Sequence, residues 1–220
     1  MQLNLLPAPR SLKVLRGTFT LPLRNPGSAV HFIHSPAAPA HPEGYALTIN
    51  ESGVRIEYRA VAGLRAGVAT FRQLMREYTV CFPCLKIRDW PDFARRGVML
   101  DISRGRVPKL ETLLDLVERL ADFKINEFQL YTEHTFAYRN YKSVWKDWGA
   151  LTGAEIRRLD ARCRELGIDL VPNQNSFGHL RYFLEHPKVK KLAEVSEPYE
   201  GSTGDFLRFP TGARLTRRRR

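Results

Sequence analysis

Three short apolar runs of this 220-residue chain are each followed by side chains that could take part in chemistry. The runs lie at residues 98–100, 127–131 and 168–171. The side chains that follow them are Asp101 and Arg104, then Glu133 and His134, then Asn173, Asn175 and His179. Carboxylates, amides, histidines and an arginine can bind hydroxyl groups or move protons. If the runs are parallel strands, these side chains meet at one edge of the sheet, where the chemistry of parallel α/β folds gathers.

The same residues also have structural interpretations. Asp101 could pair with a neighbouring arginine, and His179 could be a histidine that only holds its loop. Aromatic residues around the second run could stack on a sugar ring or could pack within their own loop. They are Tyr131, Phe136, Tyr138, Tyr141, Trp145 and Trp148. The residues alone leave these alternatives open, although the group as a whole suits a sugar site.

Two amphipathic helical patterns separate the apolar runs. The first extends from Leu110 to Ala121, with Pro108 in the first-turn position, and the second opens with the capping box Thr152–Glu155 and stops at Gly167. Each strand-and-helix unit takes roughly 30 to 40 residues, which predicts a parallel sheet with right-handed crossovers. The unbroken apolar run at 98–100 predicts a strand buried on both faces. A closed (β/α)8 barrel takes about 250 residues, so the segment from residue 95 onward holds part of a barrel or a smaller open sheet.

Residues 1–80 predict a small α+β unit. Alternating apolar residues on both sides of a Glu-Ser-Gly turn predict a β-hairpin over 45–58, and the spacing of Leu64, Val68, Phe71 and Met75 predicts a helix to Glu77. We assign residues 81–94 to a connector, 95–190 to the strand-and-helix units and 191–220 to a polar, disordered tail. The chain is therefore expected to have two folded parts.

Composition excludes several classes of protein. A hydrophobic content of 43% with 10% aromatics is enough for a core, no apolar run could span a membrane, and no signal peptide is visible, so we expect a cytoplasmic protein. Five arginines stand among the last seven residues, and without them the net charge of +12 falls to +7. The remaining basic residues are scattered and do not interleave with aromatics, so no nucleic-acid partner is expected.

The three cysteines do not predict a disulfide framework. Their odd number indicates a reducing compartment. Cys81 and Cys84 form a Cys-x-x-Cys pair, but extended chain follows it where a redox motif would open a helix, and no second pair of zinc ligands is present. We therefore expect buried or idle thiols, no metal and no cofactor.

Four motifs, taken in order, carry a resemblance to a known family. They are Asp89-Trp-Pro-Asp-Phe93, the segment from Arg96 to Arg104, Lys124-Ile-Asn126, and the segment from Val171 to His179. They resemble the start of glycoside hydrolase family 20, the β-N-acetylhexosaminidases, and the region from Leu3 to Tyr78 resembles the small domain that precedes the barrel there. The resemblance implies an α/β protein with a small α+β N-terminal domain followed by an incomplete (β/α)8 TIM barrel.

The resemblance also implies a function. Such enzymes remove a terminal β-linked N-acetylglucosamine or N-acetylgalactosamine. The 2-acetamido oxygen of the substrate attacks the anomeric carbon, an aspartate orients that group and a neighbouring glutamate protonates the leaving oxygen. By position, Arg104 matches the arginine that binds sugar hydroxyls and His179 matches a histidine near the catalytic carboxylates. Glu133 and Asn175 complete the expected substrate-binding set, and the expected partner is a carbohydrate.

Two departures from the family pattern limit this expectation. Family members often carry a histidine-rich strand followed by paired aspartates where this chain reads Gln129 to Phe136, and no Asp-Glu dipeptide follows His179. The catalytic acid pair is thus missing, and we expect a chain that is truncated before it and inactive alone. The alternative is a non-catalytic module that binds an amino sugar. An incomplete barrel also exposes apolar surface, so self-association is expected.

Overall fold

The computed structural model describes residues 3–176 and 178–193. It divides into two compact units. Unit 1 comprises residues Met1–Gly97, Leu116–Glu127 and Glu165–Ile168, and unit 2 comprises Val98–Asp115, Phe128–Arg164 and Asp169–Arg220, each so far as it is described. Apart from residues 191–193, the predicted polar tail lies outside the described residues.

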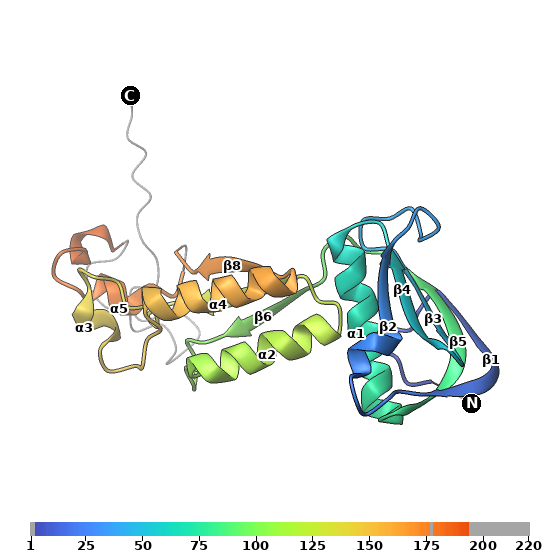
Figure 1. Ribbon diagram of the computed structural model, residues 1–220. Helices are drawn as coiled ribbons and strands as arrows, with labels where there is room; N and C mark the ends of the chain where they lie inside the picture. The colour runs from blue at the N-terminus through green and yellow to red at the C-terminus, as the bar shows by residue number, and fades with distance from the viewer. Residues whose placement is uncertain (1–2, 177, 194–220) are drawn as a thin grey trace. The chain divides into compact units, whose positions relative to one another are not determined.

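Unit 1 contains a five-stranded sheet in the order β1-β5-β3-β4-β2 (Figure 1). β2 pairs with β4 in parallel, and the other neighbours pair antiparallel. The predicted hairpin is confirmed, with the turn between Asn50 and Gly53. The predicted helix is also present and is longer than its apolar pattern. The elements are β1 (Ser11–Thr20), the 3-10 helix η1 (Pro26–Ala29), β2 (Val30–His34), β3 (Tyr45–Asn50), β4 (Gly53–Tyr58), α1 (Val61–Tyr78) and β5 (Cys81–Asp89).

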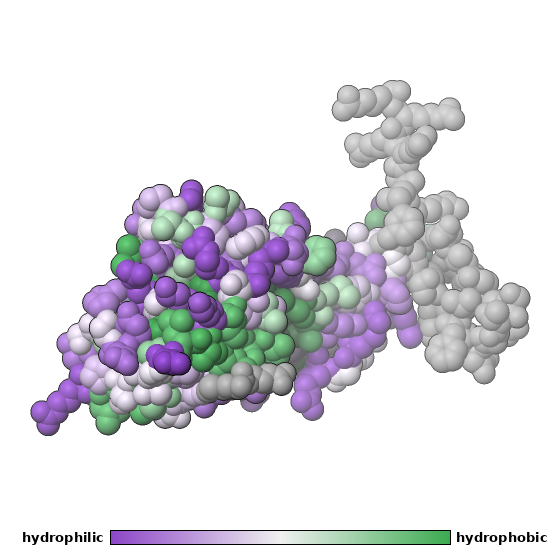
Figure 2. Space-filling view, turned by 90° about the vertical axis from the view of Figure 1, so that its right-hand side faces the viewer, coloured by the Kyte–Doolittle hydropathy of each residue, from purple (hydrophilic) through white to green (hydrophobic). Residues whose placement is uncertain are grey.

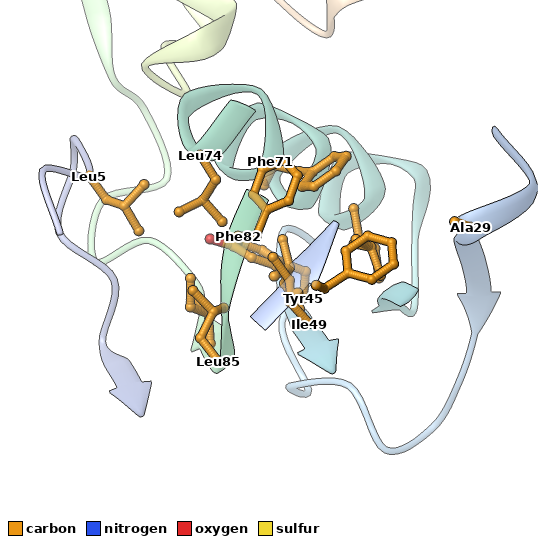
Figure 3. Packing of buried hydrophobic residues seen from close by; sticks show 14 residues of the cluster. Leu5, Ala29, Tyr45, Ile49, Phe71, Leu74, Phe82 and Leu85 are labelled. Atoms are coloured by element: carbon orange, nitrogen blue, oxygen red, sulfur yellow. The ribbon is translucent and has the colours of Figure 1, made fainter. Parts of the chain in front are cut away.

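The core of unit 1 lies between α1 and one face of this sheet. In β3, alternate residues face the helix and are fully buried, as the period of a strand requires. Figure 3 shows Tyr45 and Ile49 packed with Phe71 and Leu74 of α1. At Gly67 a Cβ atom would lie 2.6 Å from Cγ2 of Ile56, so glycine allows the helix to approach the sheet closely. The side chains of this core therefore fix both the position of α1 and the register of the five-stranded sheet.

A second sheet has three strands in the order β6-β7-β8, which is also their order along the chain. The two predicted helices are confirmed between them, and Figure 1 shows β6 and β8 pointing the same way. The elements are β6 (Gly97–Asp101), α2 (Leu110–Asp122), β7 (Glu127–Thr132), α3 (Lys142–Trp145), α4 (Gly153–Leu166), β8 (Asp169–Gln174), α5 (Arg181–Leu184) and the 3-10 helix η2 (Lys190–Leu192).

The predicted start of α4 is confirmed in its hydrogen bonds. The backbone N–H of Glu155 donates to Oγ1 of Thr152 at 3.3 Å, and the backbone N–H of Thr152 donates to Oε2 of Glu155 at 2.7 Å. Gly167 ends the helix with a φ of 76°, in the left-handed region that glycine adopts without strain. Pro108 lies two residues before α2 begins at Leu110, so it precedes the helix instead of standing in its first turn.

The expectation of a first strand buried on both faces is wrong for β6. The residue Met99 is 58% exposed. In β7, Phe128 and Leu130 are buried while Gln129 and Tyr131 between them are only half-buried. One face of this sheet is thus covered and the other is open within the described part of the chain. The range 81–94, assigned above to a connector, contains β5, which lies inside the sheet of unit 1.

Part of the surface of the molecule is apolar. Figure 2, seen from the side of Figure 1 on which the strands of unit 1 lie, shows hydrophobic surface bordered by hydrophilic surface. Exposed large hydrophobic residues of unit 1 include Leu6, Leu23, Phe32 and Val61. Among the described helices, none is both long and apolar enough to cross a membrane.

Candidate functional site

The carboxylate of Glu133 lies at the centre of a polar cluster in unit 2. Its Oε1 atom is 3.1 Å from Nη2 of Arg104 and 3.8 Å from Nδ1 of His179, and it accepts a hydrogen bond from the hydroxyl of Tyr131 at 2.9 Å. The side chain of Glu133 is only 10% exposed, whereas those of Arg104 and His179 are 60% and 61% exposed. The carboxylate therefore forms the floor of the cluster, and the two basic side chains stand at its rim.

Backbone contacts to the ends of β6 and β8 hold Glu133 in place. Its N–H donates to Oγ of Ser103 at 2.7 Å, and its carbonyl accepts from Nε2 of Gln174 at 2.9 Å. Two backbone hydrogen bonds continue the pairing there: Ile102 N–H to Tyr131 O at 3.1 Å and Asn175 N–H to Thr132 O at 2.9 Å. The three strand ends thus converge, as the sequence predicts.

Asn175 reaches the cluster through Tyr131 instead of through Glu133. Its Nδ2 donates to the Tyr131 hydroxyl at 2.6 Å, and its Oδ1 accepts from the backbone N–H of Gly178 at 3.2 Å. The second bond holds the backbone at Gly178, next to His179, whose φ of 53° is in the left-handed region. Asn175 therefore contacts both the tyrosine and the backbone beside the histidine.

Asp101 supports Arg104. Its Oδ1 accepts a hydrogen bond from the backbone N–H of Ser103 at 2.8 Å, and its Oδ2 lies 3.3 Å from Nε of Arg104. The guanidinium also lies over the ring of Tyr131, with Cζ 5.1 Å from the ring centroid. The hydrogen bond to Glu133, followed by the charge of Asp101, raises the pKa of Arg104. These contacts fit the structural interpretation of Asp101, as a partner of the neighbouring arginine.

His134 and Asn173 lie apart from this cluster. The residue His134 is 3% exposed, and its ring centroid is 4.1 Å from that of Tyr182 and 4.9 Å from that of Trp148. Its Nδ1 atom is buried with no hydrogen-bond partner among the described residues. Burial lowers the pKa of His134, and the charge of Glu133 opposes this in part. Asn173 donates instead to Oε1 of Gln129 at 3.1 Å.

The aromatic residues after β7 pack mainly on one another and on α5. Tyr138 has ring centroids 4.7 Å from Phe136 and 5.6 Å from Phe183, and its hydroxyl donates to Oε1 of Gln174 at 2.9 Å. Nε1 of Trp145 donates to the carbonyl of Tyr138 at 2.9 Å. Of the six aromatic residues considered from the sequence, Tyr131 contacts Glu133, through its hydroxyl. The contacts of the other five aromatic residues fit the interpretation that they pack within their loop.

Ser103, Gln174 and the aromatic residues of α5 were not predicted from the sequence to take part in the site. Ser103 and Gln174 bind the backbone of Glu133, so they position the carboxylate without being part of the exposed rim. Their positions at the strand ends could have pointed to them, because Ser103 lies between Asp101 and Arg104 in the sequence. The contribution of α5 had no local signal, because it depends on contacts between residues about 45 positions apart.

The prediction of buried thiols is confirmed for two of the three cysteines. Cys84 and Cys163 are buried, Cys81 is exposed, and all three are free thiols. Burial raises the pKa of the Cys163 thiol to about 11, and it also raises that of Cys84. A thiol with a raised pKa is a poor nucleophile near neutral pH because little thiolate is present. No group of three metal-binding side chains is found in residues 3–176 and 178–193.

Comparison with known proteins agrees with the resemblance seen in the motifs. Residues 22–90 match the family model described as glycosyl hydrolase family 20, domain 2. The chain is 36% identical over 104 residues to the beta-hexosaminidase subunit alpha of Mus musculus, covering 45% of this chain and 20% of that protein. It is 34% identical over 109 residues to the beta-N-acetylhexosaminidase of Cellulomonas fimi, covering 47% of this chain and 21% of that protein.

A solved structure extends the likeness to nearly the whole chain. The exo-beta-N-acetylglucosaminidase of Vibrio harveyi, solved in complex with N-acetylglucosamine, superposes with a TM-score of 0.77 at 20% identity, over 96% of this chain and 42% of that one. The chain thus spans about a fifth of the two curated relatives and less than half of this structural neighbour. The family-model match and the curated relatives support a glycoside hydrolase family 20 N-terminal region in this chain, and the solved structure shows a shared fold.

Proposed function

We propose that this chain is the substrate-binding, N-terminal part of a β-N-acetylhexosaminidase-type glycosidase, specific for a terminal β-linked N-acetylglucosamine or N-acetylgalactosamine. The observation that carries the proposal is the convergence of Arg104, Tyr131 and His179 on the carboxylate of Glu133. In this arrangement the Arg104 guanidinium and the His179 ring lie at an exposed rim above a carboxylate that accepts hydrogen bonds. Sugar hydroxyls, which both donate and accept, match that combination.

Each residue has a distinct task in the proposed site. The exposed guanidinium of Arg104 donates to sugar hydroxyls, and Glu133 fixes the guanidinium through one hydrogen bond while leaving other donors available. His179 offers a further donor or acceptor at the rim. Tyr131 and Asn175 hold these groups in position, so their contribution to binding is indirect. The chemistry is the substrate-assisted reaction in which the 2-acetamido group attacks the anomeric carbon.

The catalytic acid pair of that reaction lies outside residues 1–220 in this proposal. In support, no Asp-Glu dipeptide follows His179 in the sequence, and the chain spans 42% of the Vibrio harveyi structure. The three-stranded sheet is then the first part of a (β/α)8 barrel. The open face of the sheet, with exposed Met99 and half-buried Gln129, is what an incomplete barrel would present.

The first test is an assay with a chromogenic β-N-acetylglucosaminide. We expect background hydrolysis from the full 220-residue chain and from Arg104→Ala alike, because the acid pair is absent. Hydrolysis that Arg104→Ala abolishes, and that the surface control Arg95→Ala leaves intact, would show that the chain holds its own catalytic acid. The DNA beyond codon 220 gives a second test, since the proposal expects it to encode a strand ending in Asp-Glu.

A second candidate function is a non-catalytic module that binds an amino sugar. It is favoured by the same cluster, because the donors around Glu133 come from the three strand ends that this chain contains. This function predicts saturable binding of N-acetylglucosamine without hydrolysis, and no acid-pair segment downstream. Binding together with such a segment would instead support the first proposal.

The open sheet also supports a proposal about self-association. A sheet with an uncovered apolar face tends to associate with another apolar surface. A second copy of the chain offers such a surface. We expect size-exclusion chromatography to show species larger than the 25.3 kDa monomer, with Met99→Lys shifting the distribution toward the monomer. A single sharp monomer peak for the unaltered chain would contradict this.

A further inference from the structure

A row of side chains with four basic members, interrupted by Thr48 on the central strand, crosses the five-stranded sheet of unit 1. The Cα pairing joins Lys13 to Lys86, Lys86 to Thr48, Thr48 to Arg55 and Arg55 to His31. Each of these residues comes from a different strand, in the spatial order β1-β5-β3-β4-β2. Directly paired residues on neighbouring strands point to the same face of a sheet. We call these five residues the basic row.

The basic row faces away from α1. In β3, Tyr45 points to the helix, where its hydroxyl is 2.6 Å from Oγ1 of Thr70, and successive residues of a strand alternate between faces. Thr48, three residues after Tyr45, therefore points to the opposite face. The four basic members of the row are exposed, and Thr48 is half-buried. The row thus lies on an accessible face of the sheet.

The charges of the row are poorly balanced. Lys13 and Lys86 are direct cross-strand partners, and like charges placed opposite each other destabilise a sheet. In the part of the chain that the structure describes, neither lysine forms an ion pair, while Arg55 has Glu57 at 3.6 Å. A lysine on the edge strand β1 is explained by protection against edge-to-edge pairing. Lys86 and Arg55 lie on interior strands, where that explanation does not hold.

The spacing and composition of the row indicate what it can bind. Neighbouring strands lie about 4.8 Å apart, so the row extends for about 19 Å, long enough to contact several units of a polymer. It holds no Phe, Tyr or Trp on which nucleic-acid bases could stack, in contrast to the platforms that bind single strands. Lysine ammonium groups are compact point charges that attract sulfate or carboxylate groups.

We propose that the basic row binds an acidic polysaccharide, sulfated or rich in uronic acid, laid across the strands of unit 1. A glycan is favoured over other polyanions by the absence of stacking side chains in the row and by the match of residues 22–90, which hold four of its five members, to a glycosyl hydrolase domain. The inference concerns unit 1 alone and requires binding, not turnover. It therefore holds or fails independently of the site around Glu133.

The test compares dextran sulfate with uncharged dextran as ligands for the full chain, by calorimetry at about 150 mM salt. The variant Lys13→Glu with Lys86→Glu is matched by Lys190→Glu with Lys191→Glu, which makes the same change in charge at two exposed lysines outside unit 1. All proteins keep the C-terminal arginines, so their contribution is common to every measurement. We expect dextran sulfate alone to bind, with affinity at least tenfold lower for the row variant and less than threefold lower for the control.

Several outcomes would overturn the proposal. Equal weakening in the row variant and the control would mean that only net charge matters. Tighter binding of single-stranded DNA than of dextran sulfate, with the same dependence on Lys13 and Lys86, would identify a nucleic-acid face. Circular dichroism checks that the variants fold, and Lys13→Gln with Lys86→Gln serves as a milder replacement. Unchanged affinity in that folded glutamine variant would also refute the proposal.

Discussion

The chain contains two clusters of the same composition in different settings, each with a carboxylate, a cation and a tyrosine. In unit 1, Nζ of Lys124 lies 2.9 Å from Oδ2 of Asp89, and the hydroxyl of Tyr45 donates to the same oxygen at 3.1 Å. In unit 2, Glu133 has the equivalent contacts to Arg104 and Tyr131. The carboxylates are almost equally buried, with 9% and 10% of the side chain exposed. The cations differ, since Lys124 is 9% exposed and Arg104 is 60% exposed.

This difference separates a structural cluster from a candidate binding site. Around Asp89 the polar groups satisfy one another: Tyr45 contacts Thr70, and the backbone N–H of Arg10 donates to Oδ1 of Asp89 at 3.2 Å. Burial lowers the pKa of Lys124 and raises that of Tyr45. Around Glu133 the arginine keeps donors at the surface. The residue types in a cluster therefore do not separate a structural cluster from a candidate binding site, whereas the exposure of the cation does.

The largest expected effect is on the buried cluster. Asp89→Asn leaves Lys124 without its anionic partner, and breaking one side of a buried ion pair costs about 3–5 kcal/mol. We expect the free energy of unfolding to fall by roughly that amount in a urea titration. Replacing both residues, as Asp89→Asn with Lys124→Met, should restore much of the loss, because no uncompensated buried charge remains.

A matched control for that measurement is the exposed pair of Arg10 and Asp92. The Asp92 side chain is 72% exposed, and Asp92→Asn should change stability by less than about 1 kcal/mol. If Asp89→Asn and Asp92→Asn prove equally mild, the ion pair of Asp89 and Lys124 is not the structural element described above.

A smaller effect on stability is expected in unit 2. Arg104→Ala removes a cation that is mostly in water, so the free energy of unfolding should fall much less than in Asp89→Asn. Glu133 keeps its hydrogen bond from Tyr131 in this variant. Double-mutant cycles on the two pairs make the comparison quantitative, with a coupling energy expected to be larger for Asp89–Lys124. Equal coupling energies would remove the distinction between the clusters.

The smallest predicted effect is a dependence of stability on pH at His134. Burial lowers the pKa of His134 in the folded chain, so the unfolded chain takes up the proton first as the pH falls. The corresponding stability is present above the ordinary pKa of about 6.5 and is lost as the pH falls toward the folded value. The midpoint of thermal unfolding should thus drop between pH 7.5 and 5.5, and drop less in His134→Phe.

The control for this pH effect is His31→Gln, since His31 is exposed. It should leave the pH dependence of the midpoint unchanged. A pH dependence that His134→Phe does not reduce would assign the effect to other groups.

The sequence predicted those features that local patterns determine. The hairpin of β3 and β4, the capping box of α4 and the convergence of three strand ends each follow from alternation, turn residues or strand polarity. The clusters depend instead on pairing between distant segments. β1 and β5 are about 70 residues apart in sequence, so the opposition of Lys13 and Lys86 appears only once the register is known. For the same reason the basic residues of unit 1 look scattered along the sequence.

The sequence predicted which residues would lie near one another in the candidate site, but not how their side chains contact each other. Arg104, Glu133, Asn175 and His179 were expected together because each follows a strand, and they do lie together. That Glu133 is the floor, and that the aromatic residues after β7 pack against α5, depends on side-chain contacts that strand polarity does not specify. The exposure of Met99 was missed because an apolar run does not reveal which face is covered.

The most direct measurement of the central claim is a calorimetric titration of N-acetylglucosamine into the full chain and two arginine variants. Arg104 supplies the charged donors at the rim of the site, so Arg104→Ala should weaken binding at least tenfold. The control Arg95→Ala, at an exposed arginine 2.9 Å from Glu127, should bind like the unaltered chain. Saturable binding that depends on Arg104 is the predicted result, and no heat, or equal affinity in Arg104→Ala, would contradict it.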